Sequence, residues 1–107
     1  MLKVAVTARV RAKEGRAEEL SAAFRPLVEQ AEKEPGTLLY AVNRSTDDPH
    51  LFWVYELYTD GDAFAAHSGS DAMAAAGPVL GELIAESELI VGEALYGKGL
   101  PGKVLPS

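Results

Sequence analysis

The sequence predicts an α+β fold of the ferredoxin-like kind, a four-stranded antiparallel sheet with helices packed on one face. Three observations predict it. Apolar residues alternate with a period of two in four separate stretches, which is typical of strands. Two stretches with helical apolar spacing lie between the first and second strands and between the third and fourth. The order β-α-β-β-α-β gives this sheet when its crossovers are right-handed.

Composition limits the functions that the chain can have. Its 107 residues are 48% hydrophobic and 24% charged, which is typical of one globular domain. No apolar run approaches the roughly 18 residues of a membrane span, and no basic-then-apolar leader precedes Val4, so we expect a cytoplasmic protein without membrane contact. The net charge of −6 leaves no basic surface for nucleic acid. Without cysteine or a phosphate-binding glycine loop, and with two histidines, we expect no metal, haem or flavin.

The first strand is expected at residues 2–11, where LKVAVTARVR alternates. A helix should follow from about Arg16 to Lys33, because its apolar residues fall on one stripe. Pro26 lies inside that pattern and removes a backbone donor, so it should kink the helix. Pro35 and Gly36 then end the helix.

A hairpin follows, with strands at 37–45 and 51–58 joined by a turn at 47–50. The second of these strands has two different faces. One face carries Leu51, Trp53, Tyr55 and Leu57, and the other carries Phe52, Val54, Glu56 and Tyr58. Because both faces are largely apolar, both should be covered.

The second helical region begins with Thr59 or Asp60 as a cap and reaches His67. Ser70 should cap another helical piece, from Asp71 to about residue 85, which Gly77-Pro78 should divide or bend. The last strand is expected at 87–96. We therefore expect one domain at residues 1–97 and a tail, rich in glycine and proline, at 98–107.

Helices on one face leave the other face of the sheet uncovered. We expect that face to carry Val4, Val6, Trp53, Tyr55 and Leu57, a large apolar patch that monomers rarely expose. The simplest cover is the same face of a second copy. The sequence thus predicts a homodimer that pairs through its sheet faces.

Two titratable residues are the main candidates for chemistry. Glu56 lies among apolar neighbours, where a buried carboxylate needs a partner or takes up a proton. His67 follows one helical stretch later, and an unperturbed histidine suits proton abstraction from a phenol or an enolisable carbon. The alternatives are structural: His67 would interact with the dipole of its helix end, and Glu56 would anchor that helix to the sheet.

Other candidates would form a pocket around this pair. Tyr58 and Thr7 could bind a substrate oxygen, or each could be a core hydroxyl with a satisfied hydrogen bond. Phe52, Phe64 and Met73 would line an apolar pocket for a small hydrophobic or aromatic substrate, although aromatic residues at such spacing also form ordinary cores.

The segments TARVRAKEGRAEEL and EPGTLLYAVNRSTDDPHLFWVYELYTDGDAFAAHSGSDAM resemble the antibiotic biosynthesis monooxygenase family of small dimeric α/β-barrel proteins. The shared features are an apolar strand with a Glu near its end, then Asp, an Ala-aromatic pair, His and a Ser-containing helix start. The resemblance covers about residues 2–96. It implies a dimeric α/β barrel and places Val54, Glu56, Tyr58 and Phe64 beside a pocket between sheet and helices.

Members of that family include cofactor-free oxygenases of phenolic polyketides, quinol oxidases, haem-degrading enzymes and an isomerase of a signalling sugar. The functional positions of the haem-degrading members resemble Thr7, His67 and Ala76 or Gly77 here, so the iron-ligating histidine is missing. The polar positions of the polyketide oxygenases resemble Val54, Tyr58 and Phe64, so most of their polar groups are missing as well.

We therefore expect a cofactor-independent monooxygenase that acts with O₂ on a small phenolic, quinol or enolisable compound. His67 would be the base, Glu56 its partner, and Tyr58 and Thr7 would bind oxygen atoms. Two alternatives use the same pocket: a non-catalytic protein that binds a small molecule, and an isomerase of a small carbonyl metabolite. Oxygen consumption with a panel of quinols would separate turnover from binding alone.

Overall fold

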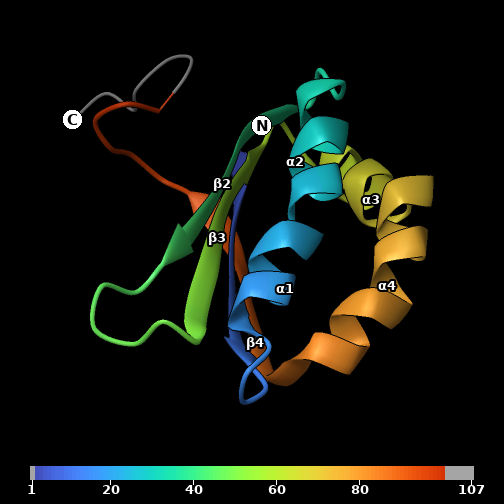
Figure 1. The fold of residues 1–107 in the computed structure, drawn as a ribbon. Helices are drawn as coiled ribbons and strands as arrows, with labels where there is room; N and C mark the ends of the chain where they lie inside the picture. The colour runs from blue at the N-terminus through green and yellow to red at the C-terminus, as the bar shows by residue number, and fades with distance from the viewer. Residues whose placement is uncertain (1, 101–107) are drawn as a thin grey trace.

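The computed structural model describes residues 2–100 and confirms the ferredoxin-like α+β fold. Strands β2, β3, β1 and β4 lie side by side in that order, and each pair is antiparallel. The helices lie together on one face of the sheet (Figure 1). The elements are β1 (Lys3–Ala12), α1 (Ala17–Ala23), α2 (Arg25–Glu32), β2 (Thr37–Arg44), β3 (Leu51–Tyr58), α3 (Gly61–Ser68), α4 (Asp71–Leu83) and β4 (Ile84–Ala94).

The helix expected at 16–33 is two helices, α1 and α2, which Phe24 separates. Pro26 lies in the first turn of α2, where its missing N–H costs nothing because that donor would have no partner within the helix. Gly77-Pro78 does not divide α4, which runs through both residues. The last strand begins earlier than expected, at Ile84, because Ile84 pairs with Ala12 of β1.

The register between strands shows which residues share a face of the sheet. Val6 lies opposite Glu56 and Val10 lies opposite Phe52, so these residues face the helices. The prediction that Val4 and Val6 belong to the uncovered face is therefore wrong. Alternation alone could not reveal this, because the sequence does not say which of the two alternating sets of β1 residues faces the helices.

The core lies between this face and the helices. Its most buried members include Leu20 of α1, Leu27 of α2 and Phe52 and Val54 of β3. The ring of Phe52 packs on that of Phe24 with 6.2 Å between centroids, and the guanidinium of Arg44 lies 4.7 Å from the Phe52 ring centre. These contacts fix α1 against the β2–β3 hairpin.

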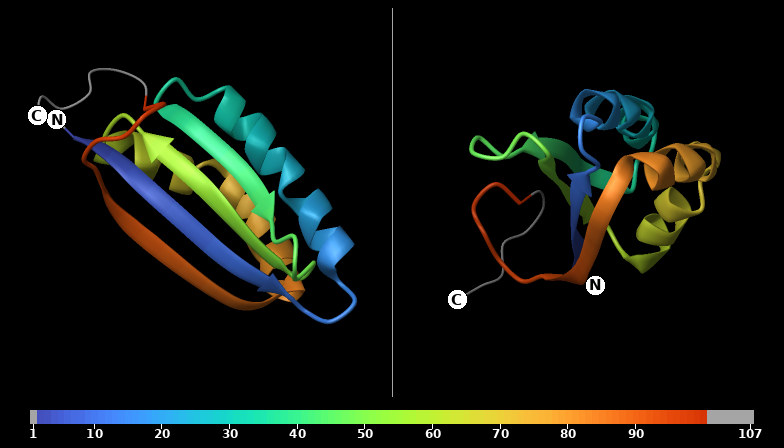
Figure 2. Two further views of the ribbon diagram at one scale, coloured as in Figure 1. Left: turned by 90° about the vertical axis from the view of Figure 1, so that its left-hand side faces the viewer. Right: turned by 60° about the horizontal axis from the view of Figure 1, so that its bottom comes forward.

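The opposite face, here called the open face, carries Thr7, Tyr55 and Ile90 across three neighbouring strands. Tyr55 is 48% exposed, whereas Leu57 on the same face is only 2% exposed. The chain after β4 bends over this side of the sheet (Figures 1 and 2). Much of the tail expected at 98–107, namely residues 101–107, lies outside the described residues.

Salt bridges cross one end of the open face. Arg9 pairs with Glu88 at 3.4 Å, and Arg11 pairs with Asp48 at 2.6 Å and with Glu86 at 3.6 Å. The rest of this face is mainly apolar. Among the helices within residues 2–100, none has the length and apolar character that crossing a membrane requires.

Candidate functional site

The turn between α2 and β2 packs closely on α3. A Cβ atom added at Gly36 would lie 2.6 Å from Cβ of Ala63, so a side chain at position 36 would force the two segments apart. The backbone N–H of Thr59 also donates to the carbonyl of Gly36 at 2.9 Å. Glycine at position 36 therefore lets the turn that carries Glu34 reach the helix that carries His67.

Helix α3 begins where the sequence predicts. Asp60 is its N-cap and accepts a hydrogen bond from the backbone N–H of Ala63 at 2.8 Å. His67 lies in the last turn, where a positive charge interacts favourably with the helix dipole. Its side chain is only 3% exposed, however, so it points into the protein and not to solvent.

His67 lines a cavity of about 180 Å³ between the sheet and the helices. We call it the inner cavity. It opens at one side, because Ser68 of α3 and Leu89 of the edge strand β4 line it and are exposed. Its walls are mostly apolar. The lining residues are Ala8, Val10, Phe24, Leu27, Tyr40, Val54, Glu56, Phe64, His67, Ser68, Met73, Leu80, Ile84 and Leu89.

The partner of His67 is Glu34, and the expected pairing with Glu56 is wrong. Nδ1 of His67 lies 2.7 Å from Oε1 of Glu34, which follows α2 in the turn towards β2. Glu56 lies close enough to interact with His67 by charge, but no hydrogen bond joins them in the described residues. The expectation failed because Glu34 is 33 residues away and reaches His67 through the Gly36 turn.

Three side chains hold the carboxylate of Glu34. Besides His67 at Oε1, Thr37 donates its hydroxyl to Oε1 at 2.8 Å, and Gln30 donates its amide N–H to Oε2 at 2.9 Å. Burial favours the neutral acid, but these hydrogen bonds outweigh it, and the pKa of Glu34 lies below its ordinary value. An ionised carboxylate only accepts hydrogen bonds, so Nδ1 of His67 carries the proton.

Glu56 has the opposite electrostatic character. It lies on the central strand β3, is buried, and accepts a short hydrogen bond from the hydroxyl of Tyr58. Burial raises the pKa of Glu56, and the Tyr58 hydrogen bond and the nearby His67 offset that effect only in part. Burial and the charge of Glu56 likewise raise the pKa of Tyr58, so its hydroxyl stays protonated. Glu56 thus binds a proton more readily than an ordinary glutamate does.

Aromatic rings enclose the imidazole of His67. The ring centroid of Tyr40 lies 4.9 Å from that of His67, and that of Tyr58 lies 5.6 Å away. The Tyr58 ring also packs on Phe64 at 5.1 Å. Burial and the carboxylates Glu56 and Glu34 raise the pKa of Tyr40, so it too remains a hydroxyl donor. These contacts hold the imidazole over strands β2 and β3.

The predicted site residues divide into two groups. The structure places Val54, Glu56, Phe64, His67 and Met73 on the lining of the inner cavity. The other three do not line it. Thr7 lies opposite Tyr55 on the open face, Phe52 is buried in the core against Phe24, and Tyr58 lies behind Glu56, to which it donates.

Sequence reasoning missed Glu34 and Tyr40. Glu34 did carry a signal, because it follows the last turn of α2, where a negative charge opposes the helix dipole. Such a local conflict points to a partner elsewhere in the fold. Tyr40 shares a strand face with Val42 but gives no sign of lying beside a histidine. In residues 2–100, no three His, Asp or Glu side chains are grouped so that they could hold a metal ion.

Comparisons with known proteins identify the family to which this fold belongs. The model of the antibiotic biosynthesis monooxygenase family matches residues 3–78. No curated protein matches the chain.

Solved structures with the same fold come from several bacteria. A Nitrosomonas europaea protein that carries the name of this family is 26% identical, with a TM-score of 0.83, and the match covers 87% of this chain and 99% of that one. A Caulobacter crescentus protein with the same family name is 29% identical, with a TM-score of 0.81 and coverage of 87% and 90%. A Shewanella oneidensis protein is 28% identical, with a TM-score of 0.83 and coverage of 87% and 91%. The chain therefore belongs to the antibiotic biosynthesis monooxygenase family.

Proposed function

We propose that the protein is a cofactor-independent monooxygenase whose substrate is a small phenolic, quinol or enolisable compound. One observation carries the proposal. The buried His67 lines a mostly apolar cavity, and its Nδ1 lies 2.7 Å from Oε1 of the charged Glu34. With the proton on Nδ1, Nε2 of a neutral ring can accept a proton.

In this reaction the substrate supplies the electrons. His67 removes a proton, and the resulting anion is electron-rich enough to reduce O₂. For a phenol, one oxygen atom enters the ring to give a quinone, and the other leaves as water, so a phenol and O₂ become a quinone and water. The protein needs to deprotonate the substrate, hold the anion and exclude water. Glu56, with its raised pKa, and Tyr40 would donate hydrogen bonds to substrate oxygens.

The size of the inner cavity favours a substrate with one aromatic ring. An apolar cavity of roughly 150 Å³ is known to hold benzene in another protein. The inner cavity, at about 180 Å³, therefore has room for one ring with a hydroxyl or two. Larger substituents would have to extend through the opening beside Leu89. Polycyclic polyketides are a poorer fit on this ground.

The proposal includes a homodimer in which the open faces of two copies pack together. Tyr55 and Ile90 support it, because both are about half exposed on a sheet face that helices do not cover. Tyr55→Asp should weaken the dimer, and light scattering would detect this as a lower mass in solution. Val79→Asp is the matched control, since Val79 is equally exposed but lies on α4. A wild type that is monomeric at micromolar concentration would contradict the dimer.

Oxygen consumption tests the reaction. We expect the wild type to consume O₂ with at least one member of a panel of single-ring phenols and hydroquinones. His67→Ala should lower turnover by roughly 10²–10⁴-fold, the range typical of a positioned acid–base group. Binding of a panel member without any O₂ consumption would favour a non-catalytic binding protein. A fully active His67→Ala variant would show that the base lies elsewhere.

A further inference from the structure

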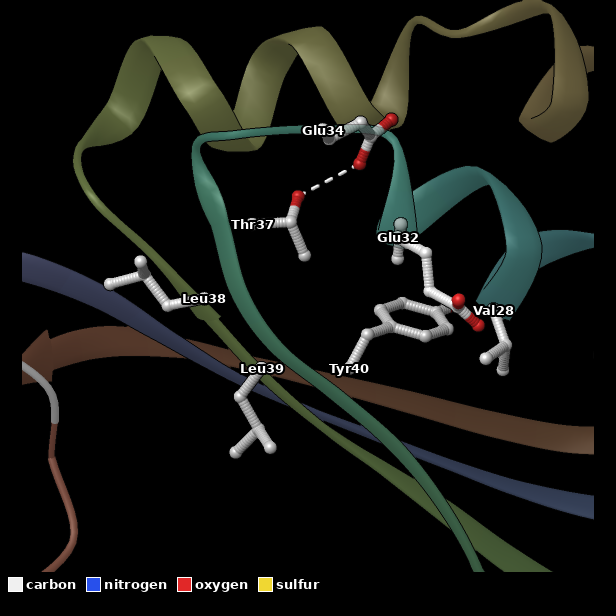
Figure 3. A pocket seen from close by; sticks show the side chains of 8 residues that line it. Val28, Glu32, Glu34, Thr37, Leu38, Leu39 and Tyr40 are labelled. Atoms are coloured by element: carbon white, nitrogen blue, oxygen red, sulfur yellow. Dashed lines mark hydrogen bonds between the residues drawn. The ribbon is translucent and has the colours of Figure 1, made fainter.

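A second hollow lies on the other side of His67, where β2 meets α2. Figure 3 shows it from close by. It has a volume of about 230 Å³, and we call it the outer hollow. Its lining residues are Val28, Ala31, Glu32, Glu34, Thr37, Leu38, Leu39 and Tyr40. Leu39 and Glu32 are exposed, so the outer hollow is open to solvent.

Three side chains connect the two hollows. His67 lines the inner cavity, Glu34 lines the outer hollow, and the 2.7 Å hydrogen bond between them connects the two. Tyr40 lines both hollows and packs on the His67 ring, so it fills the space between them. The side chain of His67 is 3% exposed and that of Glu34 is 16% exposed, so contact with solvent increases along the pair.

The hollows also open at opposite edges of the sheet. The inner cavity opens beside Leu89 on β4, and the outer hollow lies along β2. These strands are the two edges in the order β2-β3-β1-β4. A molecule entering beside β4 would therefore block the direct contact of His67 with water on that side, while the Glu34 side would stay open.

We propose that His67 and Glu34 form a proton route from the inner cavity to water in the outer hollow, which rests on the proposed role of His67 as base. Nε2 accepts the proton of the substrate, and the proton on Nδ1 passes to Oε1 of Glu34 and then to water. Charge and protons balance, because the ring gains one proton and loses one. When the product oxygen needs a proton, the same steps run in reverse and restore the original tautomer.

The surroundings of the pair support this direction of transfer. The charged or titratable side chains that face His67 are Glu34 from the α2–β2 turn, Tyr40 from β2, and Glu56 and Tyr58 from β3. The two tyrosines keep their protons and Glu56 holds a proton more readily than an ordinary glutamate. Glu34 is the group among them that is ionised and in contact with solvent, so it alone can accept a proton and pass it on.

Proton exchange measured by NMR tests the route without any substrate. With ¹⁵N-labelled histidine, the exchange of the His67 Nδ1 proton with water is followed in the wild type, Glu34→Gln and Glu32→Gln. Glutamine keeps an oxygen that accepts from Nδ1 but cannot carry the proton. We expect Glu34→Gln to slow exchange by at least about tenfold, a smaller effect than the roughly 10²–10⁴-fold of a positioned acid–base group. Glu32→Gln, the matched control in the same hollow, should leave exchange unchanged.

A second variant covers the case in which Glu34→Gln does not fold. Glu34→Ala opens space in the outer hollow, and added formate should restore fast exchange there, whereas formate should not affect the wild type. If exchange in either folded Glu34 variant matches the wild type without formate, the proton leaves through the inner cavity and the route is wrong. Because no substrate is used, a protein that consumes no O₂ would contradict the monooxygenase proposal and leave this measurement intact.

Discussion

Glu34 and Glu56 both interact with the imidazole of His67 but have opposite electrostatic character. Glu34 accepts hydrogen bonds from three side chains, and the pKa of its carboxyl is lowered although burial opposes this. Glu56 has one side-chain donor within the described residues, Tyr58, and the pKa of its carboxyl is raised. The difference between them teaches that burial and the number of facing donors act together on a carboxyl, since Glu56 is the more buried and Glu34 has the more donors. In the proposed reaction, Glu34 would therefore orient the base, and Glu56, which binds a proton more readily than an ordinary glutamate, would donate to the substrate.

The largest expected difference in stability comes from changing each of the two glutamates to glutamine. Glu34 is a charged acceptor that receives hydrogen bonds from three donors. Glu34→Gln removes this charge, so it should lower the free energy of unfolding by about 1–3 kcal/mol. Glu56→Gln removes a carboxylate that burial disfavours, so it should be nearly neutral or stabilising above pH 7. Urea denaturation at pH 8 measures both. Equal losses at the two positions would show that the two environments do not differ as described.

The pH dependence of stability should separate the two glutamates by sign. Because the pKa of Glu34 is lowered on folding, its contribution is present above its ordinary pKa of 4.5 and is lost as the pH falls through the folded value. Because the pKa of Glu56 is raised, its contribution is present below 4.5 and is lost as the pH rises through the folded value. Stability should therefore rise with pH just below 4.5 because of Glu34, and it should fall with pH above 4.5 because of Glu56.

Urea denaturation between pH 3 and pH 8 tests these signs. Glu34→Gln should reduce the loss of stability in acid, and Glu56→Gln should reduce the loss towards neutral pH. If Glu34→Gln reduced the loss towards neutral pH and Glu56→Gln reduced the loss in acid, the described difference between the two glutamates would be wrong.

The smallest effects should come from removing one neutral donor from each carboxyl. Tyr58→Phe and Gln30→Leu should each lower the free energy of unfolding by about 0.5–1.5 kcal/mol. In each variant the pKa of the affected carboxyl should rise, because a hydrogen bond to its charged form is lost. Glu34 keeps two other donors, so its change should be the smaller one. Titration of the two carboxyl carbons by ¹³C NMR measures this, and a larger change at Glu34 would count against the role of the donors.

The fold could be predicted from the sequence because its signals are local. The alternation in residues 51–58 revealed both faces of β3, and the caps Asp60 and Ser70 marked the starts of α3 and α4. The site could be predicted only in part. His67, Glu56, Val54, Phe64 and Met73 were predicted to lie at one pocket and do line the inner cavity. The prediction that Thr7 belongs to that pocket is wrong, because the face of β1 depends on its register with β3.

The partner of His67 could not be predicted, because its position depends on contacts between distant segments. Glu34 reaches His67 only when the Gly36 turn packs on Ala63 of α3. No periodicity in the sequence records that approach. Glu56, the carboxylate that lies among apolar residues of the preceding strand, was the natural expectation, and it proved to be paired with Tyr58.

The edge strand β4 has a consequence for how the protein behaves in concentrated solution. Leu89, Ile90 and Val91 are all at least half exposed on a strand with one unpaired edge, which is a template for stacking against other chains. Glu86, Glu88 and Glu93 lie on the same strand, and their negative charges repel a second such edge. Neutral glutamines at these three positions would remove that protection. The triple variant should therefore aggregate through β4 more readily than the wild type in concentrated solution.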